Sequence, residues 1–356
     1  MQEDSLFISS FKFAMRLLLF FIIMIAVSVY FGKKYEASTE HNTINAHVKQ
    51  RFEDFYALEP FTLDMAFLGS SHSYCTFDPS NFDTELGISS FQLGTPLQPY
   101  DTTYYTFKEL LKTQSPPVVV VELYWDLMDE AFEADTINSF FDVAKEEKTR
   151  TEYISEVFSL EDKIKYYITP IRYQKDYFAY KGNEYEKYLE ERYGVTKATA
   201  SAWTPRVGIE EYRSKGYVYC DYIMLDSEYD ETNQFKGYDG RNWAFGSGAK
   251  KYIEKMITVA KARNIQLIFV TAPVANVSMD YISNYHLINN EITAFAESHD
   301  VPYLDINLIA YEDDLLENRN FRDDAHLNDS GVKIVNAYFL QYLESYESTI
   351  LSRYLY

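Results

Sequence analysis

The sequence predicts an α/β protein in which helices cover both faces of a parallel sheet, a three-layer αβα arrangement. The first observation is a pair of apolar runs of strand-forming residues, at 65–68 and 118–123. The second run begins with consecutive valines, which is typical of a strand buried on both faces of a parallel sheet. The third observation is that such runs alternate with stretches that have helical apolar spacing.

The elements fall into an early and a late series. In the early series, strands are expected at 65–68, 90–93 and 118–123, with a helix that Asp101 caps and that runs to about Lys112. Regular alternation resumes after the middle of the chain. The late elements are, in order, a helix over 248–263 capped by Ser247, a strand over 265–271, a helix over 282–298, a strand over 301–306 and a helix over 331–343 capped by Ser330.

The alternation breaks between about residues 126 and 245. This segment is rich in Tyr, Lys and Glu, and its helical spacing is clearest over 164–180 and 185–193. We expect a helical insertion that covers the carboxyl end of the sheet, where lids and substrate-binding elements lie. The alternative is a peripheral subdomain with a purely structural role.

Composition excludes several classes of function. The 356 residues carry a formal net charge of −21 and a pI near 4.7, which argues against nucleic acid, because phosphate recognition requires a basic surface. Cys75 and Cys220 are the only cysteines and are expected as buried free thiols. No CxxC or Cys/His spacing points to zinc, so neither a metal nor a cofactor is expected.

An apolar stretch near the N-terminus predicts a membrane anchor. It spans 21 residues from Phe11 to Phe31, and Lys12 and Arg16 near its start can extend toward lipid headgroups. A cleavable signal peptide is the alternative, because residues 26–28 loosely resemble a cleavage site. The expected order is a cytoplasmic tail over 1–10, a transmembrane signal anchor over 11–32, a stalk over 33–60 and a globular domain over 61–356 outside the cell membrane.

Two short motifs carry the residues of a nucleophilic site. Gly69-Ser70-Ser71 follows the first strand, where α/β enzymes present a nucleophile at the edge of the sheet. The second motif, Asp323-x-x-His326, lets the carboxylate accept a hydrogen bond from Nδ1 and leaves Nε2 for the serine. Each motif alone is weak, since turns and chance produce both. Their placement at one edge of the sheet predicts that they converge on a Ser-His-Asp site.

This arrangement resembles the SGNH (GDSL-type) hydrolase superfamily. A Gly-Asp-Ser block follows strand one there, and a closing Asp-x-x-His block completes the triad, which implies Ser71 as nucleophile with Asp323 and His326 as partners. A glycine after strand two supplies a backbone donor to the oxyanion hole, and Gly94 is its match. The resemblance implies a parallel, flavodoxin-like sheet. It covers residues 62–125 and 247–345.

One block of the superfamily is missing. Its Gly-x-Asn-Asp block after strand three is replaced by Glu-Leu-Tyr-Trp-Asp, so the asparagine that donates to the oxyanion is absent. The hole would then rely on the backbone N–H groups of Ser71 and Gly94, aided by Tyr124 or Trp125. His72, which follows the nucleophile, is expected either to contact substrate or to make only a local hydrogen bond.

The anchor, the serine-rich first block and the large insertion are more similar to the extracytoplasmic acyltransferase branch of the superfamily. That branch includes the D-alanine transfer protein of teichoic acid synthesis and the alginate O-acetylation proteins. The resemblance implies transfer of an acetyl or D-alanyl group to or from a cell-envelope polysaccharide or teichoic acid, beside a membrane-bound O-acyltransferase. The alternatives are a surface carbohydrate esterase or lipase that uses water, and a non-catalytic accessory subunit.

Overall fold

The computed structural model describes residues 2–39, 43–129, 140, 143–182, 206–207 and 209–345. The chain divides into two compact units. The smaller contains Met1–Ala46 and Phe158–Ala202, and the larger contains His47–Val157 and Trp203–Tyr356. The segment predicted as an insertion is therefore shared between the two units.

The core of the larger unit is a sheet with strand order β2-β1-β3-β7-β8. Its strands are β1 (Met65–Leu68), β2 (Ser90–Gln92), β3 (Val118–Glu122), β7 (Gln266–Thr271) and β8 (Tyr303–Asp305). Every neighbouring pair is parallel. All residues of β1 and β3 are buried, as their apolar runs predict. This is the flavodoxin-like order, so the fold class predicted from the sequence is confirmed.

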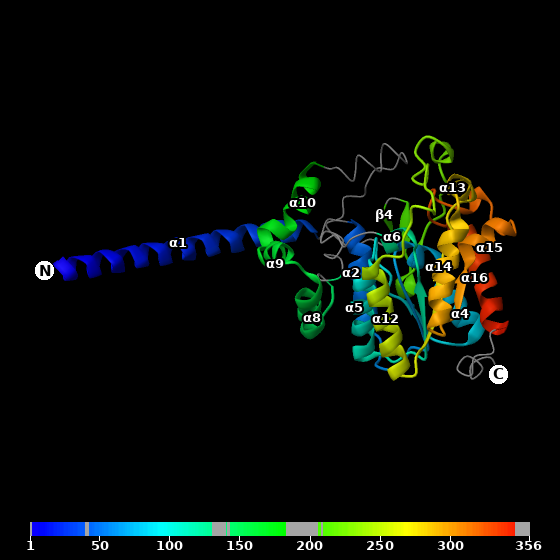
Figure 1. Cartoon of the computed structure of the whole chain (residues 1–356), viewed down its shortest axis with the longest axis horizontal. Coiled ribbons are helices and arrows are strands. Elements are labelled where there is room, and N and C mark those ends of the chain that lie inside the picture. Colours follow the sequence, from blue (N-terminus) through cyan, green and yellow to red (C-terminus); the bar gives the residue numbers. More distant parts are fainter. Residues whose placement is uncertain are drawn as a thin grey trace. The chain divides into compact units, whose positions relative to one another are not determined.

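Helices cover both faces of this sheet (Figure 1). One face carries α4 (Pro79–Leu86) and α16 (Asp329–Ser345), and the other carries α5 (Tyr100–Thr113) and α12 (Ser247–Ala262). Because successive strand residues point to opposite faces, Phe67 of β1 faces α4 and α16, and its ring lies 5.2 Å from that of Phe77. The other helices of this unit include α2 (Thr43–Tyr56), α3 (Ser71–Thr76), α6 (Asp126–Asp129), α8 (Glu147–Val157), α13 (Asn276–Tyr281), α14 (Tyr285–Ser298) and α15 (Ile306–Glu312).

The three predicted N-caps lie inside their helices rather than before them. Pro99 precedes α5, and Asp101 sits in the first turn, where its buried carboxylate accepts a hydrogen bond from a tyrosine of α8. Gly246 precedes α12. Asn328 precedes α16, and its Oδ1 accepts from the backbone N–H of Ser330 at 3.1 Å. These helices begin one or two residues earlier than predicted, because tertiary contacts as well as local capping set where a helix starts.

The insertion is not purely helical. Besides α6 and α8, it adds a three-stranded antiparallel sheet to the described part of the larger unit. Its strands are β4 (Arg206–Val207), β5 (Glu210–Tyr212) and β6 (Val218–Tyr219). Strands of this length are too short to show an alternating pattern, which is why the sequence predicted helices alone. The helix predicted over 185–193 lies outside the described residues.

The polar segment predicted as a stalk over 33–60 belongs in part to the globular unit. Helix α2 buries Val48, Phe52 and Phe55, which recur at helical spacing. The Phe55 ring lies 5.9 Å from the ring of Phe91 in β2. The stalk prediction is therefore wrong for this helix, because the charged residues between these positions conceal its apolar face.

The smaller unit contains α1 (Gln2–Thr39), α9 (Leu160–Tyr167) and α10 (Thr169–Gly182). Within α1, Ser10–Glu36 is apolar, exposed and long enough to cross a membrane. Helix α10 packs against α1, and α9 packs against α10. The helix predicted over 164–180 corresponds to α9 and α10, which are separated at Ile168, where the backbone leaves the helical conformation.

Candidate active site

The carboxyl ends of β1 and β3 lie at the point where the strand order reverses. The chain leaves β1 toward β2 at one edge and returns to form β3 on the opposite side of β1. β1 leads into the Gly-Ser-Ser motif, and β3 leads to Tyr124. Ligands of open α/β sheets bind in the crevice beyond such strand ends. The sheet therefore places the nucleophile motif where ligand binding is expected.

A tight turn between β1 and α3 presents Ser71. Gly69 has a φ of 141°, and a Cβ at this position would lie 2.8 Å from Cβ of Glu122, so only glycine fits. Ser70 is the N-cap of α3, and its Oγ accepts a 3.2 Å hydrogen bond from the backbone N–H of His72. Ser71 is consequently the first helical residue, and its own N–H has no acceptor within the helix.

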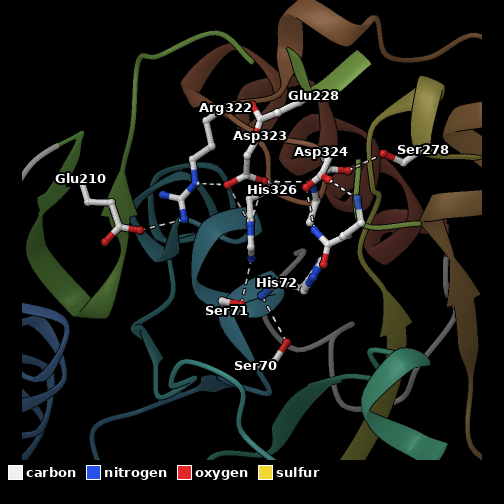
Figure 2. A network of polar contacts seen from close by, with 12 residues as sticks. Ser70, Ser71, His72, Glu210, Glu228, Ser278, Arg322, Asp323, Asp324 and His326 are labelled. Carbon is white, nitrogen blue, oxygen red and sulfur yellow. Dashed lines mark hydrogen bonds and ion pairs between the residues drawn. The ribbon is translucent and has the colours of Figure 1, made fainter. Parts of the chain in front are cut away.

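The two predicted motifs meet. His326 Nε2 lies 2.9 Å from Ser71 Oγ, and His326 Nδ1 lies 3.0 Å from Oδ1 of Asp323 (Figure 2). Asp323 Oδ1 also accepts hydrogen bonds from the backbone N–H groups of Ala325 at 2.9 Å and of His326 at 2.7 Å. The carboxylate therefore fixes the imidazole with Nε2 directed at the serine, and the predicted convergence of the motifs is confirmed.

An ion pair that the sequence did not reveal lies behind Asp323. The buried Arg322 guanidinium places Nε 3.6 Å from Asp323 Oδ2 and Nη2 2.8 Å from Glu210 Oε1 (Figure 2). Burial alone would raise the pKa of the Asp323 carboxyl, but His326 and Arg322 outweigh it and hold that pKa well below its usual range. Asp323 therefore stays ionised, as the partner of an imidazolium must.

Little in the sequence could have indicated this pair. Arg322 is adjacent to Asp323, so a cation next to the motif was a weak signal for a charge partner. Glu210 carried no signal, because it reaches the site only through the short strand β5 of the insertion.

His72 lies beside the imidazole of His326, and Tyr124, which was predicted to aid the oxyanion, stacks on His72. The His72 ring stacks on Tyr124 at a centroid distance of 3.8 Å and lies 4.6 Å from the His326 ring. Burial, together with the neighbouring His326, places the pKa of His72 well below its usual value, so the ring is neutral at pH 7. Its Nδ1 is buried without a hydrogen-bond partner among the described residues. A neutral imidazole beside the nucleophile can donate a hydrogen bond without carrying charge.

Gly94 is near the turn, but its N–H is occupied. A Cβ at Gly94 would lie 2.9 Å from the Ser70 carbonyl oxygen, which places the glycine against the nucleophile turn. Its N–H donates a 2.8 Å hydrogen bond to Oε1 of Gln92, which also exchanges hydrogen bonds with Ser73 Oγ. The predicted oxyanion donor is thus bonded within the protein. The sequence did not show this, because the competing acceptor is a side chain of the preceding strand.

Trp125 does not contribute to the crevice. Its side chain has no exposed surface, and its ring packs among the rings of Phe235, Tyr238 and Tyr285 at 4.9 to 5.8 Å. The prediction that it assists the oxyanion is therefore wrong. Adjacent residues leaving a strand diverge, and here Tyr124 faces the site while Trp125 enters the core.

Glu122 occupies the position of the expected third block and serves the turn instead. Its Oε2 accepts hydrogen bonds from Ser70 Oγ at 2.9 Å and from Ser70 N–H at 3.2 Å. Burial raises the pKa of Glu122 to about 8, although the Ser70 bonds oppose the shift. The carboxyl is therefore largely protonated at neutral pH, and it fixes the N-cap of α3 without placing a charge beside the nucleophile.

No group of three or more His, Cys, Asp or Glu side chains in the described part of the chain could hold a metal ion. Cys75 and Cys220 are both buried free thiols, as predicted.

No protein-family model matches the chain, and no curated protein matches it. Among solved structures, the chain is similar to a Bacteroides fragilis protein provisionally described as an acylhydrolase, with 12% identity and a TM-score of 0.37 over 83% of this chain and 94% of that one. It is also similar to a GDSL-like lipase from Bacteroides thetaiotaomicron, with 14% identity and a TM-score of 0.37 over 85% and 98%.

Proposed function

We propose that the protein is a serine acyltransferase or esterase anchored in the cell membrane, with its globular domain outside. The contact of 2.9 Å between Ser71 Oγ and His326 Nε2 is the observation that supports this most directly. In the first step, Nε2 takes the hydroxyl proton while Oγ attacks the acyl carbonyl carbon. Asp323 stabilises the imidazolium that forms. The C–O bond of the donor ester breaks, His326 protonates the departing alkoxide, and an acyl-serine ester remains.

In the second step an acceptor hydroxyl replaces the departed alcohol. His326 takes its proton, the acceptor oxygen attacks the acyl-serine carbonyl, and Ser71 leaves with the proton that Nε2 returns. A polysaccharide or teichoic acid hydroxyl as acceptor gives transfer, whereas water gives hydrolysis. We propose an acetyl or D-alanyl group as cargo and a membrane-bound O-acyltransferase as the partner that supplies it, on the basis of the resemblance described above and the apolar helix α1.

The oxyanion of each tetrahedral intermediate requires hydrogen-bond donors. The N–H of Ser71 is suited to this role, because the first residue of a helix has no intrahelical acceptor. The Gly94 N–H becomes a second donor only if the Gln92 side chain releases it. The neutral ring of His72 lies next to the nucleophile and is our candidate for the donor that replaces the missing asparagine.

Turnover of p-nitrophenyl acetate by the full chain in detergent tests this proposal. We expect Ser71→Ala and His326→Ala to abolish turnover, and a fluorophosphonate to label the wild type but not Ser71→Ala. His299→Ala is the matched control, because His299 follows α14 and contacts Phe295 rather than the triad. Absence of both turnover and labelling in folded wild type would exclude catalysis and favour an accessory subunit.

Transfer and hydrolysis are then separated by the acceptor. When an oligosaccharide is added to the acylated enzyme, transfer predicts that acylated sugar appears faster than free acid. Free acid formed at an unchanged rate would identify water as the acceptor and the protein as an esterase.

A further inference from the structure

Helix α9 and the start of α10 expose an unusual number of large apolar side chains. Their exposed fractions range from 38% to 76%. We call this set the α9–α10 apolar face, and it consists of Leu160, Ile164, Tyr167, Ile168 and Ile171. Soluble surfaces carry single exposed apolar residues, but a contiguous set of this kind marks a contact with a partner or a membrane.

The apolar face follows from helix geometry. Leu160, Ile164 and Tyr167 are spaced i, i+4 and i+7, so they share one side of α9. About a third of a turn around the helix, Tyr166 packs edge-on against Phe158 at a centroid distance of 5.7 Å, and the Arg172 guanidinium lies 4.2 Å above the Tyr166 ring. These contacts fix the rotation of α9, so its apolar side is held outward.

The start of α9 is equally well defined. Ser159 and Asp162 form a capping box, in which each side chain bonds the backbone N–H of the other residue. The α9 residues of the apolar face therefore belong to a regular helix with a capped N-terminus.

Contacts between α1 and α10, within the smaller unit, place the α9–α10 apolar face at one end of α1. At Gly32 a Cβ would lie 2.9 Å from Cβ of Thr169, the first residue of α10, so the absence of a side chain permits the close approach. Three residues further, the Tyr35 ring stacks on Tyr177 at a centroid distance of 4.3 Å. Both contacts lie at the end of the apolar segment Ser10–Glu36. The apolar face thus begins beside the point where α1 would leave the hydrocarbon of a bilayer.

We propose that α9 and the first turn of α10 lie in the interfacial layer of the bilayer that α1 crosses, with the α9–α10 apolar face inserted among the lipids. Amphipathic helices bind this layer through their apolar side, and tyrosine is enriched at this depth. Lys33 and Lys34 are exposed at the same end of α1, which suits anionic headgroups. Lys165 lies on the polar side of α9, where it pairs with Glu161 at 2.9 Å. This inference depends on α1 spanning the membrane and is independent of the catalytic proposal.

Lipid-depth quenching in the full chain tests the inference. An environment-sensitive fluorophore would be attached at Ile164→Cys, with Lys165→Cys on the polar flank as the matched control, in nanodiscs of neutral and anionic phospholipid. We expect blue-shifted emission and several-fold stronger quenching by headgroup-level nitroxide lipids at position 164. We expect stronger quenching by aqueous iodide at position 165.

The native thiols provide the labelling control. Burial raises the pKa of both Cys75 and Cys220, so the unsubstituted chain should take up little label unless it unfolds. Low labelling of these thiols in each variant therefore reports that the larger unit remains folded.

Two outcomes would overturn the inference. Equal iodide quenching at positions 164 and 165 would place the apolar face in water. Shielding of position 164 from iodide without quenching by nitroxide lipids would show that a second copy or another protein covers it. A probe at Ile22→Cys, in the middle of α1, distinguishes these outcomes from failure of the anchor itself, since deep nitroxide lipids must quench it if α1 spans the bilayer.

Discussion

Arg322 Nη2 lies 2.8 Å from Glu210 Oε1, and this ion pair joins the small sheet of the insertion to the loop that carries Asp323 and His326. Charges alternate along the series from Glu210 through Arg322 to Asp323, whose carboxylate contacts Nδ1 of His326. Each ionised group therefore has an opposite charge beside it in a buried setting, where an unpaired charge is costly. The insertion thus contributes to the electrostatics of the site, and we infer that Glu210 and Arg322 are positioning residues.

Replacing Arg322 or Glu210 should move the acidic limb of kcat/KM in opposite directions. Arg322→Met removes one of the cations that hold the pKa of Asp323 down, so Asp323 should protonate at higher pH and the limb should shift to higher pH. Glu210→Gln leaves the cation uncompensated and should shift the limb to lower pH. The measurement is the pH dependence of p-nitrophenyl ester hydrolysis.

The matched control for this pair is Arg319→Met. Arg319 forms an exposed ion pair with Glu317 at 2.9 Å, so its loss should leave the pH profile unchanged. A merely structural role for Arg322 would lower the amount of folded protein without moving the limb, and that result would contradict our inference.

Asp323→Asn should lower kcat by about 10⁴-fold, because an amide does not hold the imidazole in the required tautomer. Asp324→Asn is the adjacent control. Asp324 accepts hydrogen bonds from Gln234, and an asparagine oxygen can still accept from its backbone N–H, so activity should change little. Single-turnover kinetics of both variants check the prediction, and similar losses in the two would count against Asp323 as the triad acid.

Gly69→Ala should destabilise the larger unit by more than about 2 kcal/mol, because it combines an unfavourable φ with a clash against Glu122. Gly87→Ala is the comparison. Gly87 also has a positive φ, but a Cβ there meets nothing within 4 Å, so the cost should be about 1 kcal/mol. Urea denaturation followed by tryptophan fluorescence measures both, and equal losses would refute the steric argument.

The raised pKa of Glu122 predicts that the free energy of unfolding depends on pH. Below pH 4.5 the carboxyl is protonated in both folded and unfolded chains, so it contributes no pH dependence. Between 4.5 and about 8 the unfolded chain loses this proton while the folded chain keeps it, so the free energy of unfolding falls as pH rises. Above about pH 8 the folded chain has lost the proton as well, so Glu122 no longer makes the free energy of unfolding depend on pH.

Glu122→Gln removes this titration while an amide oxygen still accepts from Ser70. The free energy of unfolding of the variant should therefore fall less steeply between pH 5 and 8, each unit of pKa difference being worth about 1.4 kcal/mol. Denaturation curves at a series of pH values give both slopes. Parallel slopes would mean that Glu122 ionises in the folded protein at its ordinary pH.

The sheet and the convergence of Ser71, His326 and Asp323 could be predicted because their signals are local. β1 and β3 are apolar runs, and Ser71 and His326 lie in short motifs at expected points of the fold. The features that were not predicted depend on contacts between distant residues, which a pattern along the sequence does not contain. The pairing of Glu210 with Arg322 arises from an insertion strand of three residues, and the burial of Trp125 depends on three aromatic partners from distant segments.

The distance along the chain between Ser71 and His326, 255 positions, bears on when the protein becomes reactive. Helix α16, the last described helix, packs on α3, and its Asn336 accepts a hydrogen bond from the Asp78 N–H at 3.0 Å. These contacts hold in place the short helix that begins at Ser71. A growing chain exposes Ser71 long before it possesses the base that would activate it. If Ser71 is the nucleophile proposed above, the order in which the polypeptide is made would prevent premature acyl capture during synthesis.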